Sequence, residues 1–87
     1  MALTIVEKVK FAAQYLIELI NVLCLDRCGL IVKSDSIFFT ILVPSQNAIE
    51  QVDHVISLRL LDPILRRVEG LRLGYAIFYE WSWSPQS

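Results

Sequence analysis

The sequence predicts one α+β domain over residues 1–87, with three strands in a mainly antiparallel sheet and helices covering one face of that sheet. Three patterns carry this prediction. Apolar residues recur at helical spacing over residues 4–25, and they alternate with period 2 over residues 36–43 and 71–83. The expected order of elements is α-β-β-α-α-β, followed by a polar tail at residues 84–87. A single domain is expected because two separate cores would need roughly 100 residues each.

The first helix is expected to begin at a capping box, in which Thr4 is followed three residues later by Glu7. It should end near Leu25. Its polar residues fall on one narrow stripe, so that the apolar arc spans about 240°, whereas a surface helix needs little more than 100°. We therefore expect one side of the helix to pack on a sheet and the flank beside it to pack on something else.

Two strands are expected next, over residues 30–33 and 36–43, and the turn residues Ser34 and Asp35 should join them as a hairpin. The second strand has apolar residues on both faces, and no charged residue occurs between Asp35 and Glu50. This pattern is typical of a central strand that is covered, at least in part, on both sides.

The segment after Pro44 is expected to be helical, because Asn47 and Glu50 have the spacing of a second capping box. Apolar residues at spacings of three and four favour the helix. Residues 56–60 also alternate with period 2, so a strand there stays open as an alternative.

A short third helix is expected over residues 63–69, because Asp62 can cap it and Pro63 suits the first helical position. Gly70 should close this helix. The strand expected over residues 71–83 alternates strictly and should lie beside one of the first two strands. One of its faces carries four large aromatic residues, Tyr75, Tyr79, Trp81 and Trp83.

No group of residues in the sequence predicts catalysis. His54 has only Asp53 beside it, and consecutive helix residues point about 100° apart. Cys24 and Cys28 lack the further ligands that a zinc site needs. The three glycines are isolated, so no phosphate-binding loop is present. We therefore expect no enzyme, no catalytic residue, no metal ion and no cofactor.

The expected location is the cytoplasm, with reduced thiols. Two cysteines are too few for a disulfide framework. The first residues lack the basic start and the cleavage site of a signal peptide. The longest apolar stretch, residues 11–25, is interrupted by three polar residues and should not enter a membrane.

Nucleic acid is an alternative partner. Four arginines in the second half of the sequence are candidates for an anion-binding patch: Arg59, Arg66, Arg67 and Arg72. The expected element order is similar, in topology only, to the type II arrangement of RNA-binding KH domains. That family grips the nucleic-acid backbone with a Gly-x-x-Gly loop, whereas residues 60–63 read Leu-Leu-Asp-Pro here. The net charge of −1 also lacks the basic excess typical of nucleic-acid binding, so we infer no membership of the family.

The composition points instead to a protein partner. Apolar residues make up 55% of the chain, and a domain this small buries only about 60% of the surface that its unfolded chain exposes. The surplus must lie on a surface, where contiguous apolar patches mark interfaces. We expect the interface on the helix flank and on the last strand, a candidate sheet edge. The residues expected there are Phe11, Tyr15, Val22, Tyr79, Trp81 and Trp83. The predicted function is a small non-enzymatic interaction module, acting as a regulator, adaptor or assembly factor, that forms a homodimer.

Overall fold

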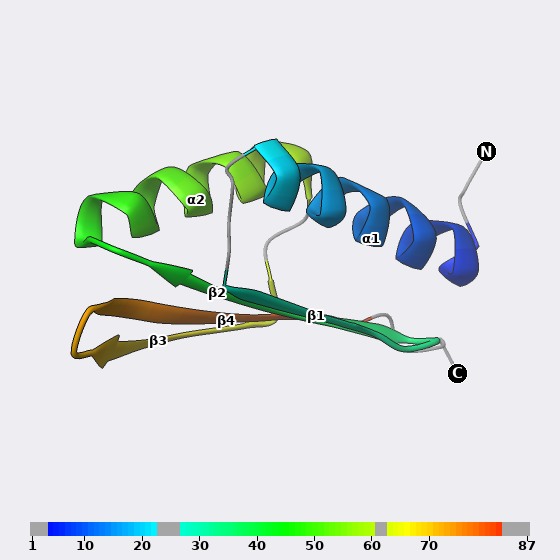
Figure 1. The fold of residues 1–87 in the computed structure, drawn as a ribbon. Coiled ribbons are helices and arrows are strands. Elements are labelled where there is room, and N and C mark those ends of the chain that lie inside the picture. Colours follow the sequence, from blue (N-terminus) through cyan, green and yellow to red (C-terminus); the bar gives the residue numbers. More distant parts are fainter. Residues whose placement is uncertain (1–3, 23–26, 61–62, 83–87) are drawn as a thin grey trace.

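The computed structural model describes residues 4–22, 27–60 and 63–82. The elements in these ranges are α1 (Ile5–Val22), β1 (Cys28–Val32), β2 (Ser36–Val43), α2 (Gln46–Arg59), β3 (Leu65–Leu71) and β4 (Gly74–Ser82). The four strands form one antiparallel sheet in the order β1-β2-β4-β3. Both helices lie on the same side of this sheet, so that the fold has two layers (Figure 1).

The structure has the predicted α+β class, but the predicted number and order of elements are wrong. The sheet has four strands rather than three, and the element order is α-β-β-α-β-β rather than α-β-β-α-α-β. The third helix expected over residues 63–69 is instead the strand β3, and Gly70 lies inside that strand. The topological similarity to KH domains rested on the predicted order, and the observed order removes it.

The hairpin between β3 and β4 explains this error. The strand expected over residues 71–83 is interrupted by a turn at Arg72 and Leu73, across which Leu71 pairs with Gly74. Gly74 has a φ of +156°, and a Cβ atom there would lie 2.3 Å from the carbonyl oxygen of Val43. Glycine is therefore required where β4 begins. Pairing with β4 satisfies the backbone groups of residues 65–71 that point toward β4, and this tertiary contact outweighs the local helix signals.

The helix starts show how far local signals hold. Thr4 Oγ1 accepts a hydrogen bond from the backbone N–H of Glu7 at 3.1 Å, which confirms Thr4 as the N-cap of the first helix. α2 begins earlier than expected, because Ser45 Oγ accepts from the backbone N–H of Ala48 at 3.3 Å and Ser45 is the N-cap. α2 continues to Arg59, so the strand alternative for residues 56–60 is wrong. The expected end of the first helix, at Leu25, lies outside the described residues.

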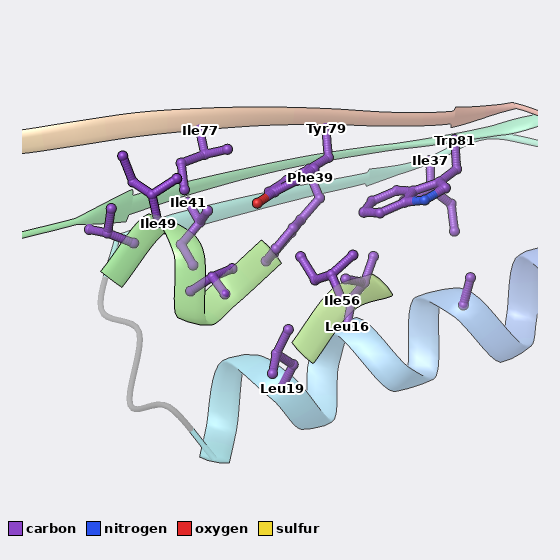
Figure 2. Close-up of a cluster of buried hydrophobic side chains, with 13 residues drawn as sticks. Leu16, Leu19, Ile37, Phe39, Ile41, Ile49, Ile56, Ile77, Tyr79 and Trp81 are labelled. Carbon is purple, nitrogen blue, oxygen red and sulfur yellow. The ribbon is translucent and has the colours of Figure 1, made fainter. Parts of the chain in front are cut away.

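The hydrophobic core lies between the helices and the inner face of the two central strands, β2 and β4 (Figure 2). The largest fully buried side chains are Leu16 of α1, Ile56 of α2, Ile37, Phe39 and Ile41 of β2, and Ile77 of β4. The strand β4 is thus central, and the expectation that the last strand lies at a sheet edge is wrong. The predicted hairpin of the first two strands is confirmed, since β1 and β2 pair antiparallel.

Candidate interaction surfaces

The sheet has a second face, which points away from the helices. Alternation along β2 sends Ile37, Phe39 and Ile41 into the core, so the residues between them point to the opposite face. The register between strands assigns their neighbours to the same face. We call six apolar residues on it the open face: Ile31 of β1, Phe38 and Leu42 of β2, Phe78 of β4, and Leu65 and Leu71 of β3.

The open face is accessible to solvent. Ile31, Leu65 and Leu71 are 59%, 51% and 50% exposed, and the other three members are half-buried. In Figure 1 both helices lie above the sheet, and the open face is the lower side. No described element therefore covers the open face. Outward residues of an antiparallel sheet with one solvated face are usually polar. An exposed apolar patch of this kind marks an interaction site.

Cations lie over both aromatic rings of the open face. The Lys33 ammonium is 5.1 Å from the centroid of the Phe38 ring, and the Arg67 guanidinium is 4.7 Å from that of Phe78. Such contacts hold long basic side chains flat against aromatic surface. The open face therefore presents apolar rings with positive charges beside them.

Carboxylates on the same face balance these cations. Glu69 lies on β3 and pairs with Arg67 at 3.2 Å. Glu80 of β4 lies between Phe38 and Leu65 in the register of the sheet. Arg27 and Arg72 also line a hollow with Leu42 and Leu71 at one end of the open face. Charges of both signs therefore accompany this face, with cations in excess.

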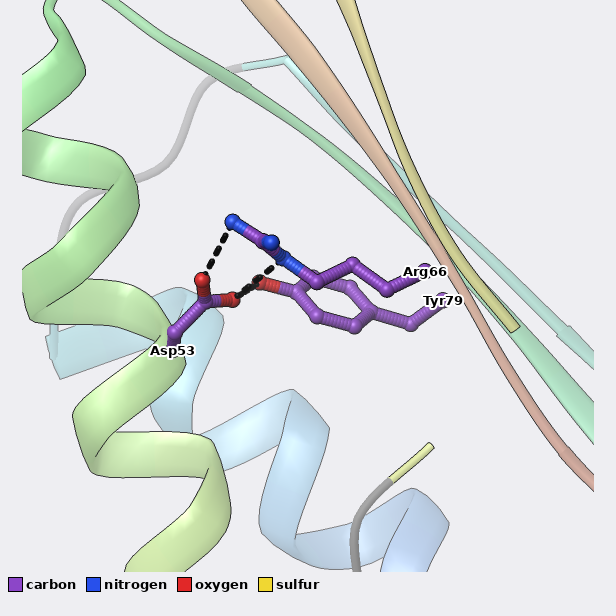
Figure 3. A network of polar contacts seen from close by, with 3 residues as sticks. All are labelled: Asp53, Arg66 and Tyr79. Carbon is purple, nitrogen blue, oxygen red and sulfur yellow. Dashed lines mark hydrogen bonds and ion pairs between the residues drawn. The ribbon is translucent and has the colours of Figure 1, made fainter. Parts of the chain in front are cut away.

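On the helix side, Asp53 ties α2 to the sheet (Figure 3). Its Oδ1 accepts hydrogen bonds from the Tyr79 hydroxyl and, at 3.2 Å, from Arg66 Nε. Its Oδ2 lies 2.5 Å from a terminal nitrogen of the Arg66 guanidinium. Burial, and then the hydrogen bond to Asp53, raise the pKa of the Tyr79 hydroxyl above its ordinary 10.0. The tyrosine therefore stays a neutral donor to the carboxylate.

The raised pKa of Tyr79 predicts a loss of stability in alkali. The neutral hydroxyl stabilises the fold fully below pH 10, the pKa of the unfolded chain, and this contribution is lost as the pH rises toward the higher folded pKa. Urea melts between about pH 8 and about pH 11 should show a falling free energy of unfolding. In Tyr79→Phe the free energy of unfolding should fall less steeply with pH, although the variant also loses the hydrogen bond to Asp53.

Tyr15 supplies the control for this experiment. Burial also raises the pKa of its hydroxyl, but the shift is smaller than that of Tyr79. Tyr15→Phe should therefore flatten the alkaline fall less than Tyr79→Phe does. Equal alkaline losses in the wild type and in Tyr79→Phe would contradict the raised pKa of the Tyr79 hydroxyl.

A cavity of about 550 Å³ opens beside this network. Buried Ile56 and Tyr79, with Pro63, form the apolar part of its lining. Exposed Glu50 and His54 of α2 also line it, so the cavity opens along that helix. It combines an apolar interior with a few polar groups, as binding pockets do.

The helix part of the predicted interface is only partly exposed. Phe11 and Val22 of α1 are 64% and 77% exposed. Tyr15 is half-buried, and its hydroxyl donates to the backbone carbonyl of Val55 at 3.1 Å. The flank of α1 at Tyr15 therefore packs against α2, whereas Phe11 and Val22 remain on the surface.

The strand part of the predicted interface lies in the core. Tyr79 and Trp81 are only 2% and 4% exposed. Their rings stack with centroids 5.5 Å apart, and Tyr79 also stacks on Phe39 at 6.1 Å. Trp83 lies outside the described residues. The structure thus does not bring the six predicted residues together on one surface.

The four arginines of the alternative patch are also separated. Arg59 lies at the end of α2, 5.7 Å from the ring centroid of Tyr15. Arg66 and Arg67 are neighbours in β3 and so point to opposite faces of the sheet. Arg72 lies in the turn before β4. No single surface carries all four side chains.

Local sequence patterns indicate these surfaces only in part. The apolar residues on both faces of residues 36–43 predicted cover on both sides, at least in part, and the described chain covers one side. The contact of Asp53 with Arg66 and Tyr79 joins positions far apart in sequence. No local pattern marks such a contact.

No family model, no curated protein and no solved structure matches the chain. In the described ranges, no helix is both long and apolar enough to cross a membrane. The same ranges hold no group of three His, Cys, Asp or Glu residues that could bind a metal ion. The open face and the cavity beside α2 are therefore the features on which a function can be based.

Proposed function

We propose that the chain is a non-enzymatic, cytoplasmic protein–protein interaction module that forms a homodimer through the open face of its sheet. The observation that supports this most directly is the apolar outer side of β2. Phe38 and Leu42 have the pattern of residues that are covered, yet no element in residues 4–22, 27–60 and 63–82 covers them. A second copy of the chain supplies that cover.

The dimensions of the sheet suit this arrangement. Two sheets can stack about 10 Å apart with their side chains interdigitated. Four strands about 4.8 Å apart, with about eight residues rising 3.3 Å each, give a flat area of about 500 Å². Two such faces bury about 1,000 Å², which is at the lower end of specific interfaces. We therefore expect a dimer of moderate affinity.

The charges favour a second copy over a partner of one charge sign. A twofold axis places residue i against residue j and residue j against residue i. Lys33 and Arg67 of one copy then have Glu69 and Glu80 of the other within the same interface. A strongly acidic partner would be repelled by Glu69 and Glu80. A strongly basic partner would be repelled by Lys33 and Arg67.

The homodimer is tested by sedimentation equilibrium at micromolar concentration. The wild type should have a mass of about 20 kDa, twice the 10.0 kDa of one chain. Ile31→Glu places a charge on a residue of the open face that is 59% exposed, so folding should tolerate it. This variant should weaken dimerisation at least tenfold, which is about 1.4 kcal/mol. Phe38→Ala, which removes a ring without adding a charge, should act in the same direction.

Leu58→Glu is the matched control. Leu58 is 68% exposed, but it lies on α2, away from the open face. This variant should dimerise like the wild type. A wild type that stays at 10.0 kDa at every concentration, or equal dissociation by Leu58→Glu and Ile31→Glu, would overturn the proposal.

A further inference from the structure

The free edge of β3 has the properties of a strand that accepts a partner. β3 ends the strand order, so one row of its backbone N–H and C=O groups points away from β4. Its pairing with β4 is continuous from Leu65 to Leu71, without a bulge. All seven residues of the strand are exposed. A straight edge of this length can template a further strand.

Two of the usual protections of an edge strand, proline and bulges, are absent from β3. Edges are also guarded by charged side chains, including charges that point inward, and β3 carries Arg66, Arg67 and Glu69. These charged side chains are held over the two faces. Arg66 is bound by Asp53, and Arg67 is bound by Glu69 and lies over Phe78. The edge therefore stays open although the strand is rich in charge.

Helix α2 leaves room above this edge. It packs on β2 and β4 and makes no close backbone contact with β3. The 550 Å³ cavity lies where α2 faces the beginning of β3, and both Pro63 and Arg66 line it. A strand added to β3 would turn every second side chain toward the helix side of the sheet. One such side chain can then enter the cavity.

We propose that the edge of β3 binds an extended segment of a partner protein as a fifth strand, with one bulky apolar side chain in the cavity and a basic side chain beside it. Ile56, Pro63 and the ring of Tyr79 form the apolar surface that the first side chain contacts. Backbone hydrogen bonds supply affinity in this mode of recognition, and the pocket supplies specificity.

The basic side chain follows from the charges around the cavity. The carboxylate of Asp53 is balanced by Arg66. Glu50 is exposed, lines the same cavity and makes no ion pair with another described residue. The cavity therefore has an excess negative charge, which a lysine or arginine of the partner segment neutralises.

Three synthetic peptides test this proposal by fluorescence anisotropy. The first has ten residues in which threonine and lysine alternate, and a central phenylalanine replaces one lysine. The lysines two positions from the phenylalanine therefore turn to the same side of the sheet. The second replaces lysine with glutamate, and the third carries N-methyl groups on alternate backbone amides of the first. The first peptide should bind with a dissociation constant of roughly 1–100 μM. The second and the third should bind at least tenfold more weakly, because they lose the charge match and the backbone hydrogen bonds.

Variants of the protein locate the binding site. Glu50→Lys should weaken binding of the first peptide at least tenfold. Glu18→Lys should leave the binding unchanged, because Glu18 is also an exposed glutamate but lies on the other helix. Hydrogen exchange should slow in β3 when the peptide is added, and it should stay constant in β1.

Equal binding of the three peptides would overturn the proposal. So would binding that Glu50→Lys leaves unchanged, or protection of β1 in place of β3. The inference is independent of the homodimer, because stacking of the open faces leaves the β3 edges free. Peptide binding should therefore persist in Ile31→Glu, in which the dimer is weakened.

Discussion

Replacing Gly74 with alanine is expected to lower the free energy of unfolding by about 2–4 kcal/mol, because overpacking and backbone strain each typically contribute 1–3 kcal/mol. The added Cβ would lie 2.3 Å from the carbonyl oxygen of Val43 and 3.2 Å from its carbonyl carbon. Both atoms belong to the backbone of the central strand β2, so neither can move aside as a flexible side chain would. The φ of +156° at Gly74 adds strain for any residue with a side chain. Urea denaturation at fixed protein concentration measures the loss.

Gly70 supplies the matched control in the same hairpin. A Cβ added there would meet no atom within 4 Å. Gly70→Ala should therefore change the free energy of unfolding by no more than about 0.5 kcal/mol, as exposed substitutions do. Equal losses in the two variants would show that Gly74 does not lie against Val43 in the folded chain.

This hairpin also marks the limit of what the sequence predicts about the fold. Some signals that act within a few residues hold here, such as the N-cap at Thr4 and the turn between β1 and β2. The helix expected after Asp62 rested on equally local signals. It is wrong because residues 65–71 find a partner strand in β4, and that contact depends on a turn at Arg72 and Leu73. The alternation of residues 71–83 in the sequence continues across this turn, so the pattern does not indicate that a turn is present.

The same reasoning applies to the predicted interface. The aromatic stripe of the last strand exceeds what a three-stranded sheet needs, and so it predicted exposed rings. With β3 added beside it, β4 becomes a central strand, and Tyr79 and Trp81 are buried in the core. Which strand is central depends on long-range pairing. Part of the surplus apolar surface lies on the outer side of the sheet, at residues such as Ile31 and Leu65. Part lies on the helices, at residues such as Phe11 and Leu58.

The open face and the β3 edge make different demands on a partner. The open face offers side chains of both charge signs around apolar rings, which suits a copy of itself. The edge offers unpaired backbone groups beside a cavity with excess negative charge, which suits an extended basic segment. Stacking would use the outward side chains of the sheet, whereas strand addition would use the backbone edge of β3, so a dimer of this chain would present two such edges. Two edges would let it bind a partner bivalently.

The position of α1 over the sheet is tested by Leu16→Ala, which is expected to lower the free energy of unfolding by about 2–5 kcal/mol. Leu16 has no exposed surface and lies in the core between α1 and the sheet (Figure 2). Truncation removes buried methyl groups and leaves a cavity that rigid neighbours such as Phe39 fill only in part.

Glu18→Ala, two residues along the same helix, should change the free energy of unfolding by no more than about 0.5 kcal/mol, because Glu18 is exposed. Both variants must be compared at one protein concentration, since dimerisation couples apparent stability to concentration. Urea melts in which Glu18→Ala were the more damaging change would mean that the opposite side of α1 faces the sheet. Glu18 and its neighbours on the helix would then form part of the core. The burial of Leu16, Ala12 and Leu19 on one stripe argues against this rotation of α1 about its axis.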